Sequence, residues 1–157
     1  MTPENGSDKA NGHNEACEFP AVPRDPGLVK KILTQYRTVA VVGISKKEDR
    51  DSHRVAAYLK SNGFKIVPVN PTADMILGEK CYKKLADIPF KADVVDVFRK
   101  PSALMELAGE IIEYGPRSVW FQIGVIDNEA AQKIIDAGIE VIQNMCMMVE
   151  HKKLAAD

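Results

Sequence analysis

Five short runs of β-branched and other apolar residues recur along the chain, each followed by residues that favour a turn. They occupy residues 38–42, 65–69, 93–98, 118–123 and 139–142. Apolar runs of this length with little alternation are typical of strands buried on both faces, as in a parallel sheet. The pattern therefore predicts five parallel strands.

Helical patterns separate these runs, with apolar residues three or four positions apart. Pro26 and Pro101 suit first-turn positions. Asp51 or Ser52 is expected to cap the helix after the first strand, and Asp127 the helix after the fourth. Residues 77–89 are expected to be irregular, with one short helical turn.

Strands that alternate with helices at this spacing predict an α/β fold. We expect a Rossmann-like, doubly wound, five-stranded parallel sheet in a three-layer α/β/α arrangement, with the strands in the order 3-2-1-4-5. In such sheets ligands bind at the carboxyl ends of the strands, where the strand order reverses. The residues that follow the strands are therefore the first candidates for function.

Composition adds a domain boundary. The chain has 157 residues, of which 45% are hydrophobic and 27% charged, as in one ordinary globular domain. Residues 1–27 are polar and hold five acids against two bases. We expect a disordered tail there, because such a stretch buries little apolar surface. The folded domain is expected over residues 28–157.

Charge and cysteine content narrow the partners and the compartment. The net charge of −1 does not suggest a general nucleic-acid binder. No apolar stretch approaches the roughly 18 residues of a membrane-spanning helix, and the polar N-terminus has no signal core. The chain has only three cysteines, and an odd number cannot pair completely. This argues against a disulfide framework and favours a reducing cytoplasm.

The turn after the first strand could bind a phosphate. Gly43 ends the strand, Ser45 follows it, and four bases lie within residues 46–54. The next helix is expected to begin near Ser52, where free backbone N–H groups and the helix dipole favour an anion. The alternative interpretation is a solvated basic loop.

Three further strand ends carry candidate residues. Pro71 could form an apolar lip for a purine. Phe98 and Arg99 could frame an adenine and a phosphate, although a core phenylalanine and a surface arginine explain them more simply. Gln122 is polar within an apolar run, so it is expected to find a hydrogen-bond partner.

The sequence disfavours an ordinary nicotinamide dinucleotide site. Its fingerprint has glycine at the third position and often at the sixth, where this chain has Ser45 and Glu48. The acid expected after the second strand is replaced by Asn70.

No catalytic constellation and no metal-ligand motif stands out. Cys146 and His151 lie five residues apart, which does not place them well on one helix face. A buried thiol in a Met-rich packing segment is the favoured interpretation.

Eight short motifs in order resemble the small, stand-alone coenzyme A-binding protein family. The fold of that family is similar to the N-terminal domain of the succinyl-CoA synthetase alpha subunit. The motifs lie at residues 39–45, 52–55, 67–71, 77–82, 85–89, 94–99, 119–125 and 146–151. The resemblance covers about residues 28–154.

The resemblance implies a crevice that holds coenzyme A. It places Gly43, Ser45, Lys46, Arg50 and Ser52 at the phosphates. It places Val69 and Pro71 on the adenine side, with Val97, Phe98 and Arg99 opposite. It places Gln122 and Ile123 toward the pantetheine arm.

The expected function is therefore binding of coenzyme A or an acyl-CoA, as a non-catalytic binding, carrier or regulatory module. One alternative is an enzyme that uses CoA thioesters, with Cys146 as acyl acceptor. A less favoured one is an NAD(P)-binding oxidoreductase. A homodimer would suit the sheet edges and the Met-rich segment, but the sequence does not decide it.

Overall fold

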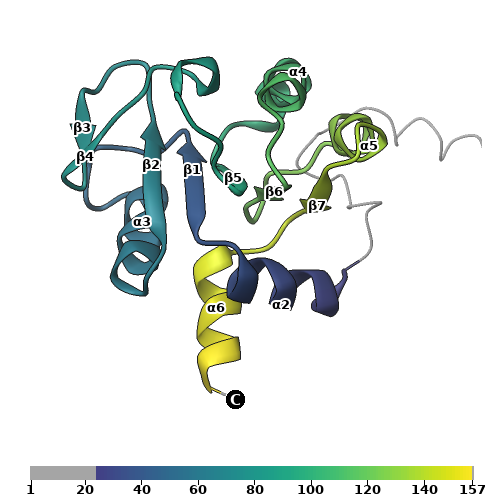
Figure 1. The fold of residues 1–157 in the computed structure, drawn as a ribbon, viewed down its shortest axis with the longest axis horizontal. Helices are drawn as coiled ribbons and strands as arrows, with labels where there is room; N and C mark the ends of the chain where they lie inside the picture. The colour runs from purple at the N-terminus through teal and green to yellow at the C-terminus, as the bar shows by residue number, and fades with distance from the viewer. Residues whose placement is uncertain (1–23, 157) are drawn as a thin grey trace, which may run out of the picture.

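The computed structural model describes residues 24–156, and its five main strands form one parallel sheet (Figure 1). The strands are β1 (Thr38–Val42), β2 (Lys65–Val69), β5 (Val94–Val97), β6 (Ser118–Phe121) and β7 (Glu140–Ile142). The helices are α2 (Pro26–Gln35), α3 (Asp51–Ser61), α4 (Leu104–Tyr114), α5 (Asn128–Asp136) and α6 (Met147–Ala156). The predicted α/β fold is confirmed. Of the tail predicted over residues 1–27, residues 1–23 lie outside the described part.

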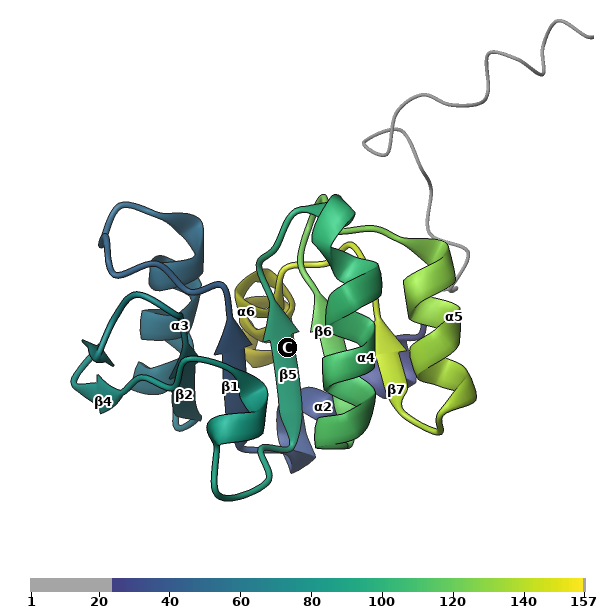
Figure 2. The same ribbon diagram turned by 90° about the horizontal axis from the view of Figure 1, so that it is seen from above.

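The sheet lies between two helical layers (Figures 1 and 2). Helices α2, α3 and α6 cover one face, and α4 and α5 cover the other. Alternate strand residues enter separate cores: Val41 and Trp120 face the first layer, and Val42 and Phe121 the second. This arrangement explains the near-continuous apolar runs, because both faces of every strand are buried.

The predicted strand order is wrong. The observed order is β2-β1-β5-β6-β7, which is 2-1-3-4-5 in the numbering of the prediction. Pro68 supplies the physical reason, since a proline has no N–H to donate and is confined to edge strands. Its carbonyl points away from β1, toward the Tyr82 N–H at 3.0 Å, so its nitrogen faces the side of β2 that carries no strand.

The connection from β2 to β5 differs from a standard helical crossover. It holds a small hairpin of β3 (Met75–Ile76) and β4 (Glu79–Lys80), then the 3-10 turn η2 (Leu85–Asp87). The sequence predicted the short turn but not the hairpin. Because β5 lies beside β1, the strand order reverses between these two strands, and their carboxyl ends border the crevice.

Helix ends agree with the sequence in part. Asp127 caps α5, and its side chain accepts a hydrogen bond from the Ala130 N–H. The N-cap of α3 is Arg50, which makes no side-chain capping bond, so the expected cap at Asp51 or Ser52 is wrong. A 3-10 turn, η3 (Pro101–Ala103), precedes α4. Helix α6 was not predicted, and none of the described helices is long and apolar enough to cross a membrane.

Candidate ligand-binding groove

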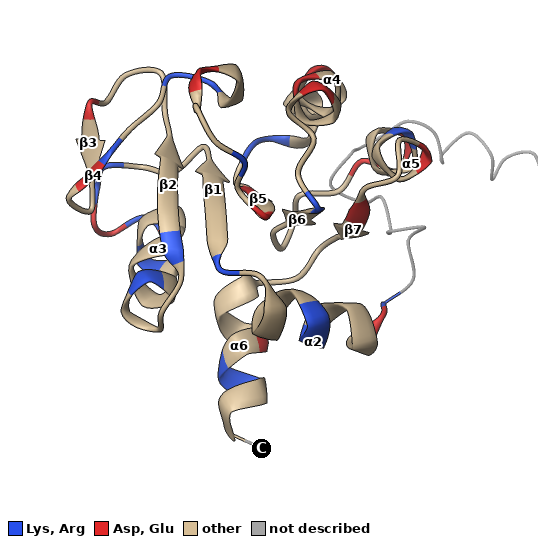
Figure 3. Cartoon of the chain, viewed as in Figure 1, with Lys and Arg blue, Asp and Glu red and all other residues tan. Residues whose placement is uncertain are grey.

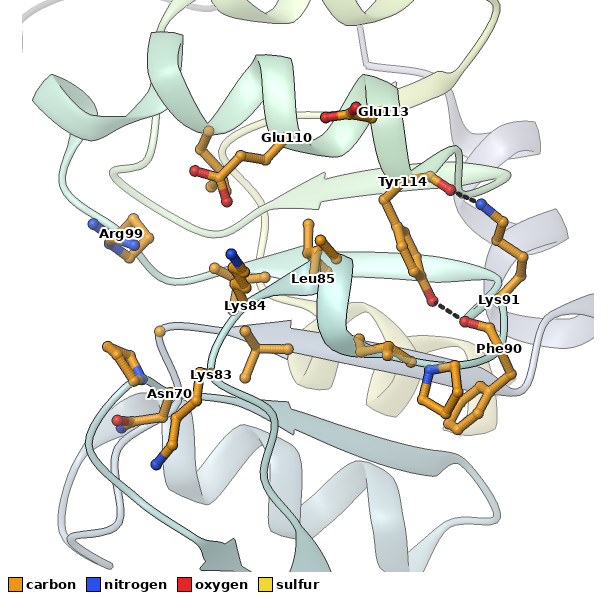
Figure 4. Close-up of a pocket in the computed structure, with 18 residues that line it drawn as sticks. Asn70, Lys83, Lys84, Leu85, Phe90, Lys91, Arg99, Glu110, Glu113 and Tyr114 are labelled. Atoms are coloured by element: carbon orange, nitrogen blue, oxygen red, sulfur yellow. Dashed lines mark hydrogen bonds between the residues drawn. The ribbon is translucent and has the colours of Figure 1, made fainter.

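A groove of about 1040 Å³ opens where β1, β2 and β5 end (Figure 4). It continues along α4, and the segment of residues 83–91 forms its opposite wall. Of the residues expected from sequence, the groove brings together Gly43, Val69, Pro71 and Arg99. This volume lies near the upper end of the range for small-molecule sites, roughly 300–1,000 Å³.

Gly43 allows the loop after β1 to lie directly against the loop after β5, at the edge of the groove. Its φ is +88°, and a Cβ at this position would lie 2.2 Å from the carbonyl oxygen of Phe98. The loop is fixed on both sides, because the Gly43 N–H donates to the Val69 carbonyl at 3.1 Å and the Phe98 N–H donates to the Val42 carbonyl at 2.9 Å. Only glycine fits here without a shift of the backbone.

Asn70 fixes the end of β2 against the end of β1. Its side-chain amide donates to the carbonyl of Ile44 at 2.8 Å. Its side-chain oxygen accepts from the Thr72 N–H at 2.7 Å and from the Thr72 hydroxyl at 2.8 Å. Asn70 therefore shapes the groove beside Pro71, a positioning role that sequence reasoning did not assign to it.

The two walls carry opposite charges. Lysines stand in the segment after β4, and glutamates stand on α4 (Figure 3). Within residues 24–156, the side chains of Arg99 and Lys84 form neither a hydrogen bond nor an ion pair. Lys83 donates to the Ala73 carbonyl and Lys91 to the Tyr114 carbonyl. Arg99 and Lys84 are therefore the groove cations free to meet an anionic or polar ligand.

The basic loop after Gly43 lies outside the lining of the groove. The Ser45 N–H donates to Ser52 Oγ at 2.9 Å, and the Lys47 N–H donates to Ser45 Oγ at 3.0 Å. Both hydroxyls thus fold the loop onto the start of α3. Lys46 and Arg50 are exposed, and neither side chain has an ion-pair partner in the described part of the chain.

The remaining predicted residues are spread over other environments. Val97 is fully buried in the core, and Phe98 is half-buried and packs against the core on the α3 side. Ile123 follows β6 and is 66% exposed. None of these three lines the groove, so their predicted contacts with a ligand stay predictions.

Gln122 has the hydrogen-bond partner that was expected for a polar residue in an apolar run. Its side-chain amide donates to Oδ1 of Asp96, and both side chains are buried. Burial raises the pKa of Asp96 to about 7, and the Gln122 hydrogen bond lowers it only in part. Asp96 Oδ2 has no hydrogen-bond partner among the described residues.

Cys146 and His151 form no thiol–imidazole pair in the structure. His151 Nδ1 is hydrogen-bonded to the Tyr58 hydroxyl at 2.8 Å, and the imidazole ring packs edge-on against Tyr58 and Phe64. These contacts fasten α6 to α3. No group of three metal-ligating side chains is present within residues 24–156.

The comparisons with known proteins match this architecture. The sequence profile described as a CoA binding domain matches residues 37–152. The chain belongs to the CoA-binding domain family. The family covers β1 to β7, and so includes every strand end that borders the groove.

Relatives of this CoA-binding domain occur both alone and within larger enzymes. "Uncharacterized protein YneT" of Bacillus subtilis (strain 168) is 38% identical over 123 residues, which cover 78% of this chain and 91% of that protein. "Acetate--CoA ligase [ADP-forming] II" of Archaeoglobus fulgidus is 37% identical over 81 residues, but these cover 50% of this chain and only 12% of the ligase. A solved structure, "hypothetical protein from Pyrococcus horikoshii OT3", has a TM-score of 0.82, 40% identity, and coverage of 88% of this chain and 97% of that chain.

Sequence reasoning on this CoA-binding domain missed one whole wall of the groove. The segment of residues 83–91 looked irregular, and α4 looked like a helix with only a core-facing stripe. A signal was present, because Glu110 stands three residues after Leu107 and four before Tyr114, in line with two buried residues. The carboxylate on that line was therefore a candidate for a side chain at the border of a groove.

Proposed function

We propose that the chain binds coenzyme A or an acyl-CoA in the groove at the carboxyl ends of β1, β2 and β5. The observation that carries the proposal is the close approach of the Gly43 backbone to the Phe98 carbonyl, next to the Arg99 side chain, which has no partner in the described residues. This geometry sets a free guanidinium beside the close approach of two strand ends, and a guanidinium can donate paired hydrogen bonds to a phosphate. Membership of the CoA-binding domain family supports the same ligand.

The basic loop extends this site at its mouth. Lys46 and Arg50 carry unneutralised charge on the chain that leaves Gly43, and we assign them to the phosphates together with Ser45 and Ser52. Pro71 and Val69 supply an apolar side for the adenine. Phe98, Val97, Gln122 and Ile123 belong to the same proposed contact set, with the last two toward the pantetheine arm.

We assign the chain the role of a binding, carrier or regulatory module. The free thiols of Cys81 and Cys146 fit a reducing cytoplasm. The homodimer stays a prediction, which light scattering of the purified protein checks.

A thermal-shift titration with coenzyme A, acetyl-CoA, ADP, NAD and NADPH tests the ligand class. A ligand that binds only the folded state adds about 2.7 kcal/mol of stability at a hundredfold excess over its Kd. We expect shifts with coenzyme A and acetyl-CoA and none with NAD. A shift with NAD or NADPH alone would contradict the proposal and favour the oxidoreductase.

The double variant Arg99→Ala/Lys46→Ala tests the site. Each charge-assisted contact contributes about 1.5–3 kcal/mol, so we expect the affinity for coenzyme A to fall at least about tenfold. The matched control is Lys30→Ala/Lys133→Ala, which removes the same charge from exposed positions on α2 and α5. Equal affinities of the two double variants would refute the assignment of the phosphate site.

A further inference from the structure

A stripe of residues on α4 faces the groove, and one of them has no partner. Leu107, Glu110 and Tyr114 all line the groove and are spaced three and four apart, on one helix face. Leu107 and Tyr114 are buried in the core, whereas the Glu110 carboxylate forms no hydrogen bond or ion pair within residues 24–156. A ligand that fills the groove displaces the water around this carboxylate. Binding is then favourable only if the ligand donates a hydrogen bond to the carboxylate in place of that water.

The opposite wall presents one free ammonium to the same space. Lys84 precedes η2, and its backbone carbonyl accepts from the Asp87 N–H at 3.0 Å, which fixes where its side chain leaves the chain. Lys83 and Lys91 are held by backbone carbonyls, whereas Lys84 is not. Figure 4 shows Glu110 and Lys84 facing each other across the groove, with Arg99 to one side and Leu85 to the other.

Glu110 and Lys84 have opposite hydrogen-bonding abilities. A carboxylate only accepts hydrogen bonds, and an ammonium only donates them. Adenine presents an amino group that donates and a ring nitrogen, N7, that accepts on one edge. Guanine and hypoxanthine carry a carbonyl oxygen in place of that amino group, and an oxygen facing Glu110 would repel it. The apolar residues Val69, Leu85 and Leu107 line the same groove and suit the faces of a purine, with Val69 on the side already assigned to the adenine.

We propose that Glu110 and Lys84 both bind the base of the nucleotide and that Glu110 selects adenine. Glu110 accepts a hydrogen bond from the amino group, and Lys84 donates one to a ring nitrogen. The inference rests on the proposed coenzyme A site, because it takes the phosphates to lie near Arg99. It assigns the two residues different effects: Glu110 decides which purine binds, and Lys84 strengthens binding of any purine.

Calorimetric titration with adenosine 3′,5′-bisphosphate and inosine 3′,5′-bisphosphate tests the inference. We expect the wild-type protein to prefer the adenine compound about tenfold or more, the effect of one well-placed pair of contacts to a base. Glu110→Gln should reduce this preference to about threefold or less, since an amide both donates and accepts. Lys84→Met should weaken both compounds by a similar factor and leave their ratio unchanged.

The control variant is Glu106→Gln, which removes the same charge from an exposed position of α4 that does not line the groove. It should keep the wild-type preference. An unchanged preference in Glu110→Gln, or a wild-type protein that binds coenzyme A yet treats both bisphosphates alike, would overturn the base-reading role and leave the proposed function standing. A wild-type protein that binds neither coenzyme A nor the bisphosphates would overturn both. Circular dichroism checks that each variant is folded.

Discussion

Replacing Asp96 by asparagine should remove a pH dependence that one buried carboxyl imposes on the fold. Asp96 is fully buried on β5, and burial raises its pKa from 3.8 to about 7. Below the unfolded-state pKa both states are protonated and the carboxyl has no effect on stability. As the pH rises from there toward 7, the unfolded state releases the proton while the folded state keeps it, so the free energy of unfolding falls.

The size of the effect follows from the difference in pKa. One unit corresponds to about 1.4 kcal/mol, so a difference of roughly three units makes the fold about 4 kcal/mol less stable above pH 7 than with a carboxyl that never ionises. Between about pH 5 and pH 8 the same relation gives a loss of about 2 to 3 kcal/mol. Asparagine does not ionise, and its side-chain oxygen can still accept the hydrogen bond from Gln122.

Urea denaturation of the wild-type protein and Asp96→Asn at pH 5 and pH 8 measures this loss. Other titrating groups are common to both proteins, so the difference between their unfolding free energies isolates Asp96. We expect that difference to shift by about 2 to 3 kcal/mol in favour of the variant as the pH rises. A difference that is the same at both pH values would refute the reasoning, because the buried carboxyl would then not titrate in this window.

Three further predictions concern the groove and its surroundings. Gly43→Ala should lower the unfolding temperature and abolish detectable binding of coenzyme A, because its Cβ would collide with the Phe98 carbonyl; a normal unfolding temperature would contradict the close approach. Tyr114→Phe should cost about 1–3 kcal/mol in urea, since the hydroxyl accepts from the Ala92 N–H and donates to the Phe90 carbonyl; no loss would show these bonds to be replaceable. Iodoacetamide should label Cys146 before Cys81 in the native protein, as burial raises the pKa of the Cys81 thiol; mass spectrometry of the peptides decides the order.

Much of the fold could be read from the sequence because the strands are buried on both faces. Runs such as residues 38–42 carry that signal locally, and the two cores confirm it. The strand order is not a local property, and the expectation followed the commoner nucleotide-binding arrangement. Pro68 was a local signal for the observed order, since it excludes a strand on the outer side of β2.

The sequence predicted the part of the groove at the strand ends, but not the part that lies between residues 83–91 and α4. Gly43, Pro71 and Arg99 follow strands directly, so the rule for carboxyl ends located them. Lys84 and Glu110 face each other across the groove because η2 packs near α4 in the folded chain, and the sequence spacing alone does not show this. Helix α6 was missed for a similar reason, because contacts such as the bond from Tyr58 to His151 stabilise it rather than a regular apolar stripe.

The wall of the groove formed by residues 83–91 is anchored at both of its ends by a tyrosine. Tyr82 exchanges backbone hydrogen bonds with Pro68 and Asn70 at one end, and the Tyr114 hydroxyl holds Phe90 and Ala92 at the other. No strand of the sheet runs through this interval. The exposed positions of residues 83–89 can therefore be exchanged on an unchanged frame, provided that the buried Leu85 and Ile88 are kept. Such variants offer a direct route to altered ligand preference without redesign of the core.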